Sequence, residues 1–197
     1  MKLVCLVTIL CCSILASCGN SIFRTSLADR VSRSLVTVKF PSVESPGETN
    51  LCTGFIVSAS KGQVLTATHC VPEDPTIEVF VNDLPSAVLK KTETLALLKI
   101  KPMTGPPLEI RRIPLEIGTF VHSFGFGHGK LVIFGRRVAA LYDGDVALDG
   151  SLIGGMSGGP VVDVDGKVVG INQAVFWNVV GIACGQDEIR DFITRNY

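Results

Sequence analysis

The sequence predicts an all-β protein, a double β-barrel followed by a short C-terminal helix. Two observations carry this prediction: a dozen short apolar runs separated by turn-rich segments, and their division into two groups by the proline-rich stretch KPMTGPPLE. Many short strands with frequent turn signals are typical of sandwiches and barrels. The 197 residues are enough for one compact unit or for two small barrels that share a core.

The first group of runs fills residues 35–101, the expected N-terminal barrel. Its first run alternates apolar and polar residues, as a strand with one buried face does. A loop is expected over 41–50, and a Ser-Lys-Gly turn lies between the second and third runs. The expected strands are 35–40, 54–58, 63–68, 77–81, 87–89 and 95–100.

An inter-barrel linker is expected over 102–119, and the C-terminal barrel over 120–185. Asp165-Gly166 between two valine-rich runs predicts a hairpin turn. In residues 186–197, Ile189, Phe192 and Ile193 have the i, i+3, i+4 spacing of one helix face. The expected strands of this barrel are 120–124, 131–134, 138–141, 161–164, 168–172 and 178–183.

The N-terminus has the pattern of a signal peptide over residues 1–17. Lys2 precedes about fifteen uncharged residues, too few for a spanning helix and typical of a secretory signal. The run ends in Leu15-Ala16-Ser17-Cys18, which resembles the lipobox of bacterial lipoproteins. The resemblance implies a lipid on Cys18, a polar tether over 18–34, and anchoring to a periplasmic or outer membrane of a bacterial envelope. An ordinary cleaved signal and secretion remain the alternative.

Composition and motifs exclude several classes of protein. The formal net charge is zero, so nothing favours the clustered basic surface that nucleic-acid binding requires. No cofactor motif is present. The chain contains no CxxC and no HExxH, and its three histidines lack ligand spacing, so no metal site is expected.

Residues 154–160, GGMSGGP, surround Ser157 with glycines. A serine nucleophile needs a neighbouring base and backbone N–H groups that stabilise an oxyanion, and glycines permit such a turn. A plain glycine-rich turn before the next strand is the alternative. The segment also matches G-x-S-x-G, but the hydrolase elbow needs a helix after the serine and a later histidine, and neither is predicted here.

The segments CTGF, VLTATHC, GMSGGPVV and KVVGIN, in this order, resemble the trypsin/chymotrypsin family. The closest likeness is to small bacterial HtrA-type peptidase domains, here without a PDZ domain. The resemblance implies a chymotrypsin-like double barrel and a serine endopeptidase acting on polypeptides. It further implies that His69 is the general base, that Ser157 is the nucleophile, and that the N–H groups of Gly155 and Ser157 form the oxyanion hole.

Three cysteines remain in the expected exported domain. Export permits a disulfide, and a bridge between Cys52 and Cys70 would be worth about 3 kcal/mol by loop-closure entropy. In the family, a cysteine also begins one strand and a second directly follows the histidine. Cys184 is then expected to be a buried free thiol.

One departure from the family concerns the acid of the catalytic triad. The segment TETLALLKI places Thr94 where the family has an aspartate. That acid orients the histidine and stabilises imidazolium, and within the family its replacement by an amide costs about 10⁴ in turnover. Three interpretations stay open: weak catalysis with Thr94, rescue by Glu93 or another acid such as Asp74 or Asp83, or an inactive domain that binds peptides or envelope components.

Two further expectations concern specificity and activation. The aligned pocket has Ser151 near its base and Gln173, Ala174 and Val175 along one wall. Because none of these is acidic, a small or apolar side chain before the scissile bond is expected. Met156 replaces the aspartate that trypsin-like zymogens pair with a new N-terminus, so the site is expected to form without propeptide cleavage.

Overall fold

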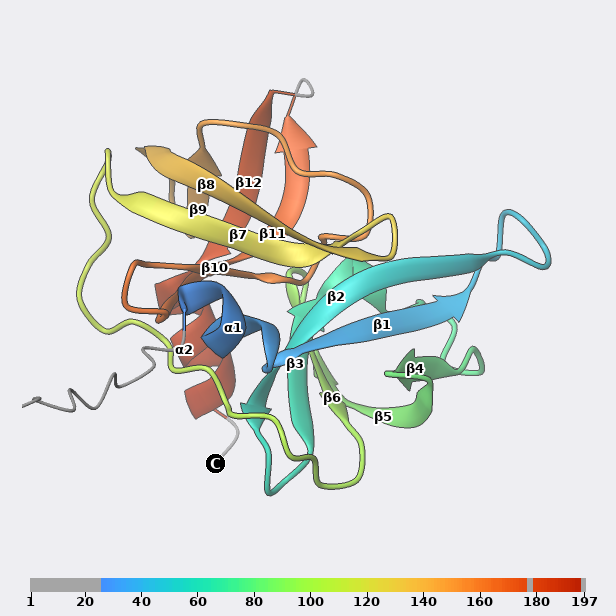
Figure 1. Ribbon diagram of the computed structural model, residues 1–197. Coiled ribbons are helices and arrows are strands. Elements are labelled where there is room, and N and C mark those ends of the chain that lie inside the picture. The colour runs from blue at the N-terminus through green and yellow to red at the C-terminus, as the bar shows by residue number, and fades with distance from the viewer. Residues whose placement is uncertain (1–25, 177–178, 196–197) are drawn as a thin grey trace, which may run out of the picture.

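The computed structural model describes residues 26–176 and 179–195. In this part of the chain twelve strands form two closed six-stranded barrels, with helix α1 (Leu27–Ser32) before them and α2 (Gln186–Thr194) after them (Figure 1). The predicted fold class is therefore confirmed. The predicted signal peptide and the lipid-bearing Cys18 lie outside the described residues. None of the described helices has the length and apolar character needed to cross a bilayer.

The N-terminal barrel closes in the order β1-β2-β3-β6-β5-β4. Strands β3 and β6 form its most buried part, because every residue of β3 and the first four of β6 are buried. The second strand begins at residue 49, so the loop predicted over 41–50 is shorter than expected. The strands are β1 (Leu35–Pro41), β2 (Thr49–Ser58), β3 (Gln63–Ala67), β4 (Val79–Val81), β5 (Leu84–Lys91) and β6 (Leu95–Lys99).

The C-terminal barrel closes in the order β10-β11-β12-β9-β8-β7. The strands predicted over 131–134 and 138–141 form one continuous strand, β8. Gly135, Arg136 and Arg137, which lie between them, pair with β7 and keep the chain extended. Strand β9 is absent from the sequence prediction. The strands are β7 (Phe120–Gly127), β8 (Lys130–Leu141), β9 (Asp145–Leu148), β10 (Pro160–Val162), β11 (Val168–Phe176) and β12 (Val180–Gly185).

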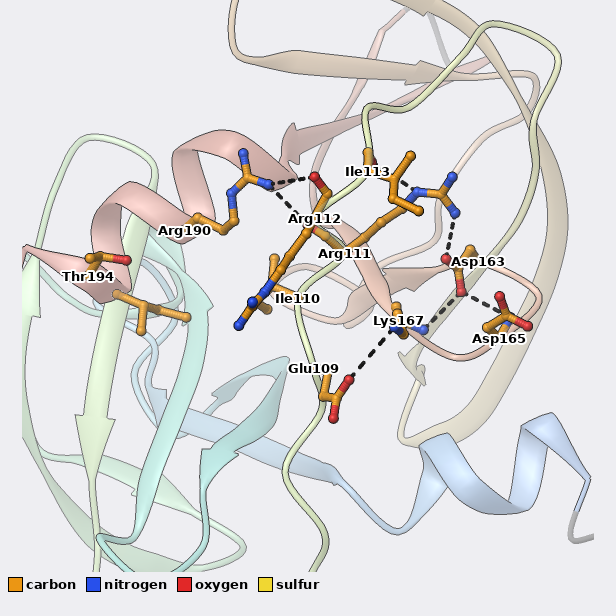
Figure 2. A pocket seen from close by; sticks show the side chains of 11 residues that line it. Glu109, Ile110, Arg111, Arg112, Ile113, Asp163, Asp165, Lys167, Arg190 and Thr194 are labelled. Atoms are coloured by element: carbon orange, nitrogen blue, oxygen red, sulfur yellow. Dashed lines mark hydrogen bonds and ion pairs between the residues drawn. The ribbon is translucent and has the colours of Figure 1, made fainter.

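The segment between the barrels has no strand of its own and is tied to the C-terminal barrel. Arg111 forms an ion pair with the buried Asp163, 2.7 Å between Nη1 and Oδ2. Arg190 of α2 donates to the carbonyl oxygens of Arg111 and Arg112, as Figure 2 shows. A pocket opens here, between the linker, α2 and the turn at Asp165, but none of the predicted site residues lines it.

A single apolar core joins the two barrels. Phe55, Leu65 and Leu95 of the first barrel belong to the same buried cluster as Phe124 and Ile171 of the second. Helix α1 lies within the segment predicted as a tether and contributes Val31 to this core, so the end of that segment is packed. The shared core fixes the position of the strand before His69 relative to the loop that carries Ser157.

Candidate active site

His69 lies in a single 3₁₀ turn, Thr68–Cys70, directly after β3. The structure joins Cys52 of β2 to Cys70 in a disulfide with a Cα–Cα distance of 5.9 Å. A ring nitrogen of His69 lies within 4.8 Å of both sulfur atoms, but sulfurs bonded to each other are not thiolate ligands, so this group is no metal site. His69 keeps solvent contact, and partial burial of the ring lowers its pKa below the ordinary value of 6.5.

Ser157 lies in the loop between β9 and β10, and its glycines are required by close packing. Gly155 has φ +94°, and a Cβ there would overlap the carbonyl oxygen of Phe126. Gly158 has φ +79°, and a Cβ there would overlap the Thr66 hydroxyl and the carbonyl oxygen of Thr53. Both positions therefore exclude other residues, by backbone conformation and by space.

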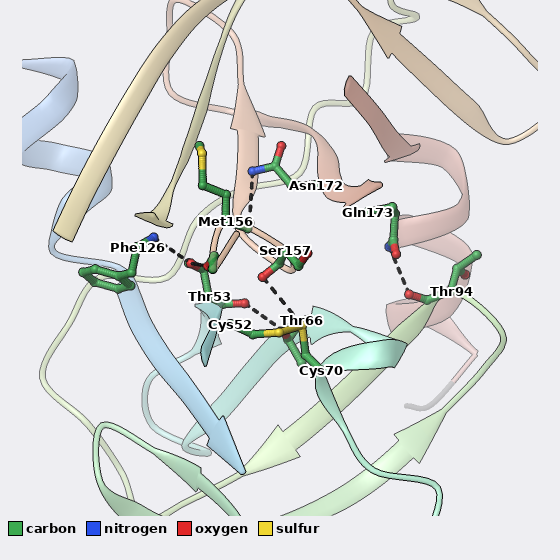
Figure 3. The surroundings of a disulfide bond; sticks show 11 residues. Cys52, Thr53, Thr66, Cys70, Thr94, Phe126, Met156, Ser157, Asn172 and Gln173 are labelled. Atoms are coloured by element: carbon green, nitrogen blue, oxygen red, sulfur yellow. Dashed lines mark hydrogen bonds between the residues drawn. A yellow bond between two sulfur atoms is a disulfide. The ribbon is translucent and has the colours of Figure 1, made fainter. Parts of the chain in front are cut away.

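Thr53 of β2 connects this loop to the first barrel (Figure 3). Its N–H donates to the carbonyl oxygen of Ser157 over 2.8 Å, and its hydroxyl donates to that of Gly155 over 2.7 Å. The same hydroxyl accepts from the N–H of Phe126 over 2.8 Å. The carbonyl oxygen of Ser157 also lies 3.6 Å from the sulfur of Cys70, the residue after His69. The backbone of the serine is thus held beside the histidine turn.

Asn172 of β11 holds the loop from the second barrel. Its side-chain amide donates to the carbonyl oxygens of Phe124, over 3.0 Å, and Met156, over 3.3 Å. Its backbone N–H donates to Gly159, and its carbonyl oxygen accepts from Gly158. Met156 is fully buried, so an apolar side chain fills the place before the serine.

The N–H groups of Gly155 and Ser157 are free to bind an oxyanion. Met156, Gly158 and Gly159 donate their N–H groups to backbone carbonyls. Among the described residues, the N–H groups of Gly155 and Ser157 donate to no protein acceptor. Unpaired donors beside a candidate nucleophile match the requirement for oxyanion stabilisation.

Backbone contacts bring the segments of His69, Ser157 and Thr94 together, but no hydrogen bond joins the three side chains among the described residues. Over the described residues, His69 forms no hydrogen bond with Ser157, Thr94 or Glu93. Thr94 does lie beside the histidine turn, because its carbonyl oxygen accepts from the N–H of Thr68 over 2.9 Å. Its hydroxyl, however, donates to the carboxylate of Glu188 in α2.

The other acids named by the sequence are placed differently. Glu93 is exposed and has no hydrogen bond or ion pair in the part of the chain that the structure describes. Asp74 accepts from the hydroxyl and N–H of Thr76, and these two hydrogen bonds lower its pKa. Asp83 pairs with Lys39 over 2.7 Å. None of the three is bonded to His69.

The residues predicted for the specificity pocket lie on β11 and in the loop that precedes Ser157. Val175 pairs with Gly181, whose N–H donates to Gly150 over 2.8 Å, and this brings β11 close to the segment of Ser151. Gln173 turns toward the first barrel and donates to the carbonyl oxygen of Thr94 over 3.0 Å (Figure 3). Ala174 is exposed.

Four residues at this site are missing from the sequence prediction. Thr53 and Asn172 are polar residues in otherwise buried strands, a pattern that signals a structural hydrogen bond. Arg136 reaches the carbonyl oxygen of Ser151 over 2.8 Å. Glu188 reaches Thr94 from 94 residues further along the chain, and no local pattern marks that contact.

Comparisons with known proteins find related sequences. Residues 52–171 match the family described as the trypsin-like peptidase domain. The serine protease HTR4 of Rattus norvegicus is 31% identical over 160 residues, which are 71% of this chain and 33% of that protein. A probable periplasmic serine endoprotease, DegP-like, of Chlamydia pneumoniae is 31% identical over 140 residues, 62% of this chain and 28% of that protein. The chain thus spans about a third of these curated relatives.

The fold has close counterparts among solved structures. The active form of the Rv3671c protease from M. tuberculosis superimposes with a TM-score of 0.75. The match covers 86% of this chain and 83% of that one at 19% sequence identity. At this identity the likeness concerns the fold.

Proposed function

The chain belongs to the trypsin-like peptidase family, and on this premise we propose that it is a serine endopeptidase with His69 as general base and Ser157 as nucleophile. The Ser157 oxygen attacks the carbonyl carbon of the peptide bond while its proton passes to His69. The carbonyl oxygen becomes an oxyanion that accepts hydrogen bonds from the N–H groups of Gly155 and Ser157. Collapse breaks the C–N bond, and His69 returns the proton to the leaving amine; water then releases the acyl group by the same steps.

The pair of unpartnered N–H groups is the observation that best supports this proposal. Met156, Gly158 and Gly159 of the same loop donate their N–H groups to backbone carbonyls, whereas these two stay available to a ligand. One such donor is worth about 10² to 10³ in turnover. The lowered pKa of His69 also supports the proposal, because it keeps the imidazole neutral, as a general base must be, at neutral pH.

A second candidate function has an observation in its favour. His69 has no hydrogen bond to Ser157 or to the third triad position over the described residues. A domain with this arrangement and no turnover would be a pseudoprotease that binds peptides or envelope components through the same cleft. Apo sites often have long catalytic contacts that tighten with substrate, so we place the peptidase first.

A fluorophosphonate probe separates the two candidates, because it reacts only with an activated serine. We expect the full chain to be labelled at neutral pH, and Ser157→Ala and His69→Ala to lose the label. Thermal unfolding of each variant serves as the control for folding. A folded protein that stays unlabelled, and that releases no peptide from unfolded casein, would establish the pseudoprotease instead.

We further propose that the protein is exported and held at a bacterial envelope membrane by lipid on Cys18, with the boundaries of the two barrels and the linker as the sequence predicts. The chain's similarity to a relative named as probably periplasmic supports export. Metabolic labelling with an alkyne fatty acid should mark the wild type, and Cys18→Ala should lose both the label and the membrane fraction. Secretion of an unlabelled wild-type protein would support the ordinary signal peptide.

For specificity, we propose a small or apolar residue before the scissile bond. The support is that none of the four pocket positions is acidic, including Ser151 at the base. A library of peptides varied at that one position should show higher kcat/KM for alanine or valine than for lysine. A preference for lysine would contradict the proposal.

A further inference from the structure

A polar cluster lies behind Thr94, on the side of the molecule that α2 covers. Glu188, in the first turn of α2, accepts from the Thr94 hydroxyl through one carboxylate oxygen. Its other oxygen accepts from the thiol of Cys184, 3.2 Å away. Burial, and then the charge of Glu188, raise the pKa of Cys184, so this residue stays a neutral thiol and acts as a donor.

The direction of the Thr94 hydrogen bond determines what its hydroxyl can offer to His69. A hydroxyl has one proton and two acceptor lone pairs. The carboxylate of Glu188 cannot donate when it is ionised, so the proton of Thr94 is directed at Glu188 and the lone pairs remain for another donor. The Nδ1–H of His69 is such a donor, and Thr94 already lies beside the histidine turn through its bond to Thr68.

No cation neutralises Glu188 within the part of the chain that the structure describes. The pocket beside it is also lined by Lys90 from β5, Asp143 from the turn before β9, Asp191 from α2, and Arg195 directly after α2. The Lys90 ammonium instead donates to the carbonyl oxygen of Phe192, 3.4 Å away. Asp145 faces the cluster from β9, and its burial, followed by the charge of Glu188, raises its pKa. The negative charge of Glu188 therefore raises the pKa of both Asp145 and Cys184.

We propose, building on the function proposed for His69 and Ser157, that Glu188 is a positioning residue that supplies the missing negative charge to His69 through the Thr94 hydroxyl. The family's single acid is replaced by two side chains. Thr94 accepts the Nδ1–H and fixes the tautomer, and Glu188 polarises that hydroxyl and stabilises the imidazolium. His69 has to turn toward Thr94 to form this contact, which we expect when the ring is protonated, because the imidazolium is then attracted by the charge of Glu188.

The decisive measurement is the pKa of His69, followed by NMR of its ring proton in the full chain. Glu188→Gln keeps the shape and an acceptor oxygen but removes the charge, so the imidazolium loses stabilisation and the His69 pKa should fall by about half a unit or more. Thr94→Val, which removes the hydroxyl, should lower it similarly, while Thr94→Ser should restore the wild-type value. In the double variant Glu188→Gln/Thr94→Val, the pKa of His69 should fall no further than in either single variant.

Glu93→Gln is the matched comparison, because it removes the neighbouring carboxylate without touching the cluster. A His69 pKa that is the same in Glu188→Gln as in the wild type, or that falls in Glu93→Gln instead, would overturn the proposal. A merely structural role of Glu188 would lower thermal stability without moving the titration.

Activity gives an independent test with a different variant. Thr94→Asp places a carboxylate against Glu188, and the two repel each other. In Thr94→Asp/Glu188→Gln the amide can donate to the new aspartate, so we expect kcat/KM at least about tenfold above that of Thr94→Asp alone. Equal values for the two would count against the proposal.

Labelling of Ser157 and titration of His69 together separate the role of Glu188 from the peptidase activity. Labelling of Ser157 with an unmoved His69 titration would keep the peptidase and overturn the role of Glu188. A moved titration without any labelling would support the coupling of Glu188 to His69 and overturn the peptidase.

Discussion

The two sides of His69 are built differently. On the serine side, the loop of Ser157 is fixed from both barrels, by Thr53 from one and Asn172 from the other. On the acid side, the Thr94 hydroxyl donates to the carboxylate of Glu188 in the C-terminal helix. The backbone of the serine loop is therefore held by several hydrogen bonds and close packing, whereas Thr94 is joined to Glu188 by a single side-chain contact.

The largest effect should come from closing the space at Gly158. In Gly158→Ala the new methyl group overlaps the Thr66 hydroxyl and the Thr53 carbonyl oxygen at a positive φ. We expect urea unfolding to show a loss of about 4 kcal/mol in the free energy of unfolding. We also expect the fluorophosphonate probe to label Ser157 no longer. Gly47→Ala is the matched control, since it has φ +93° and no heavy atom within 4 Å of the new Cβ. If both variants lost the same stability, close packing at the loop would not be the cause.

Removal of the disulfide should have the next largest effect. Cys52→Ala/Cys70→Ala frees a loop with a sequence separation of 18, and loop-closure entropy makes the bridge worth about 3 kcal/mol. The denaturation midpoint should fall, and the wild type should fall to a similar value in reductant. Cys184→Ala, which keeps the bridge and removes the remaining described thiol, is the control and should still show the fall in reductant. An unchanged midpoint in reductant would show that the bridge does not stabilise the fold.

A smaller loss of stability is expected for Thr53→Val. The substitution keeps the shape but leaves the carbonyl oxygen of Gly155 and the N–H of Phe126 without the hydroxyl. Unsatisfied buried groups of this kind cost about 2 kcal/mol, and the labelling rate should fall because the oxyanion loop loosens. Thr53→Ser retains the hydroxyl and should stay near the wild type. Equal losses in the two variants would assign the effect to the lost methyl group.

The smallest effect is in the pH dependence of the wild type. Only neutral His69 can accept the serine proton, so kcat/KM should fall as the pH drops through the pKa of this residue. Because burial lowers that pKa, the midpoint of the acid limb should lie below 6.5. Labelling rates across a pH series measure it, with the intrinsic hydrolysis of the probe as the control. A midpoint above 6.5 would show that a nearby negative charge outweighs the burial in the working enzyme.

Much of the fold was predictable from local patterns. Alternation and short apolar runs located the strands of both barrels, and the spacing of Ile189 and Phe192 located α2. The error at β8 and β9 has a physical cause: Gly135 and two arginines look like a turn, but pairing with β7 keeps them extended. Local sequence reports what a segment prefers, and a neighbouring strand can override that preference.

Short segments of the chain were enough to specify the double barrel, the glycines around Ser157 and the absence of the family's aspartate at Thr94. Which groups meet at the site depended on the folded chain as a whole. Folding set Thr53 against the serine loop, turned the Thr94 hydroxyl to Glu188 and left the N–H groups of Gly155 and Ser157 unpaired. Contacts between residues distant in the chain follow from the closure of the barrels and the docking of α2, and no local pattern encodes them.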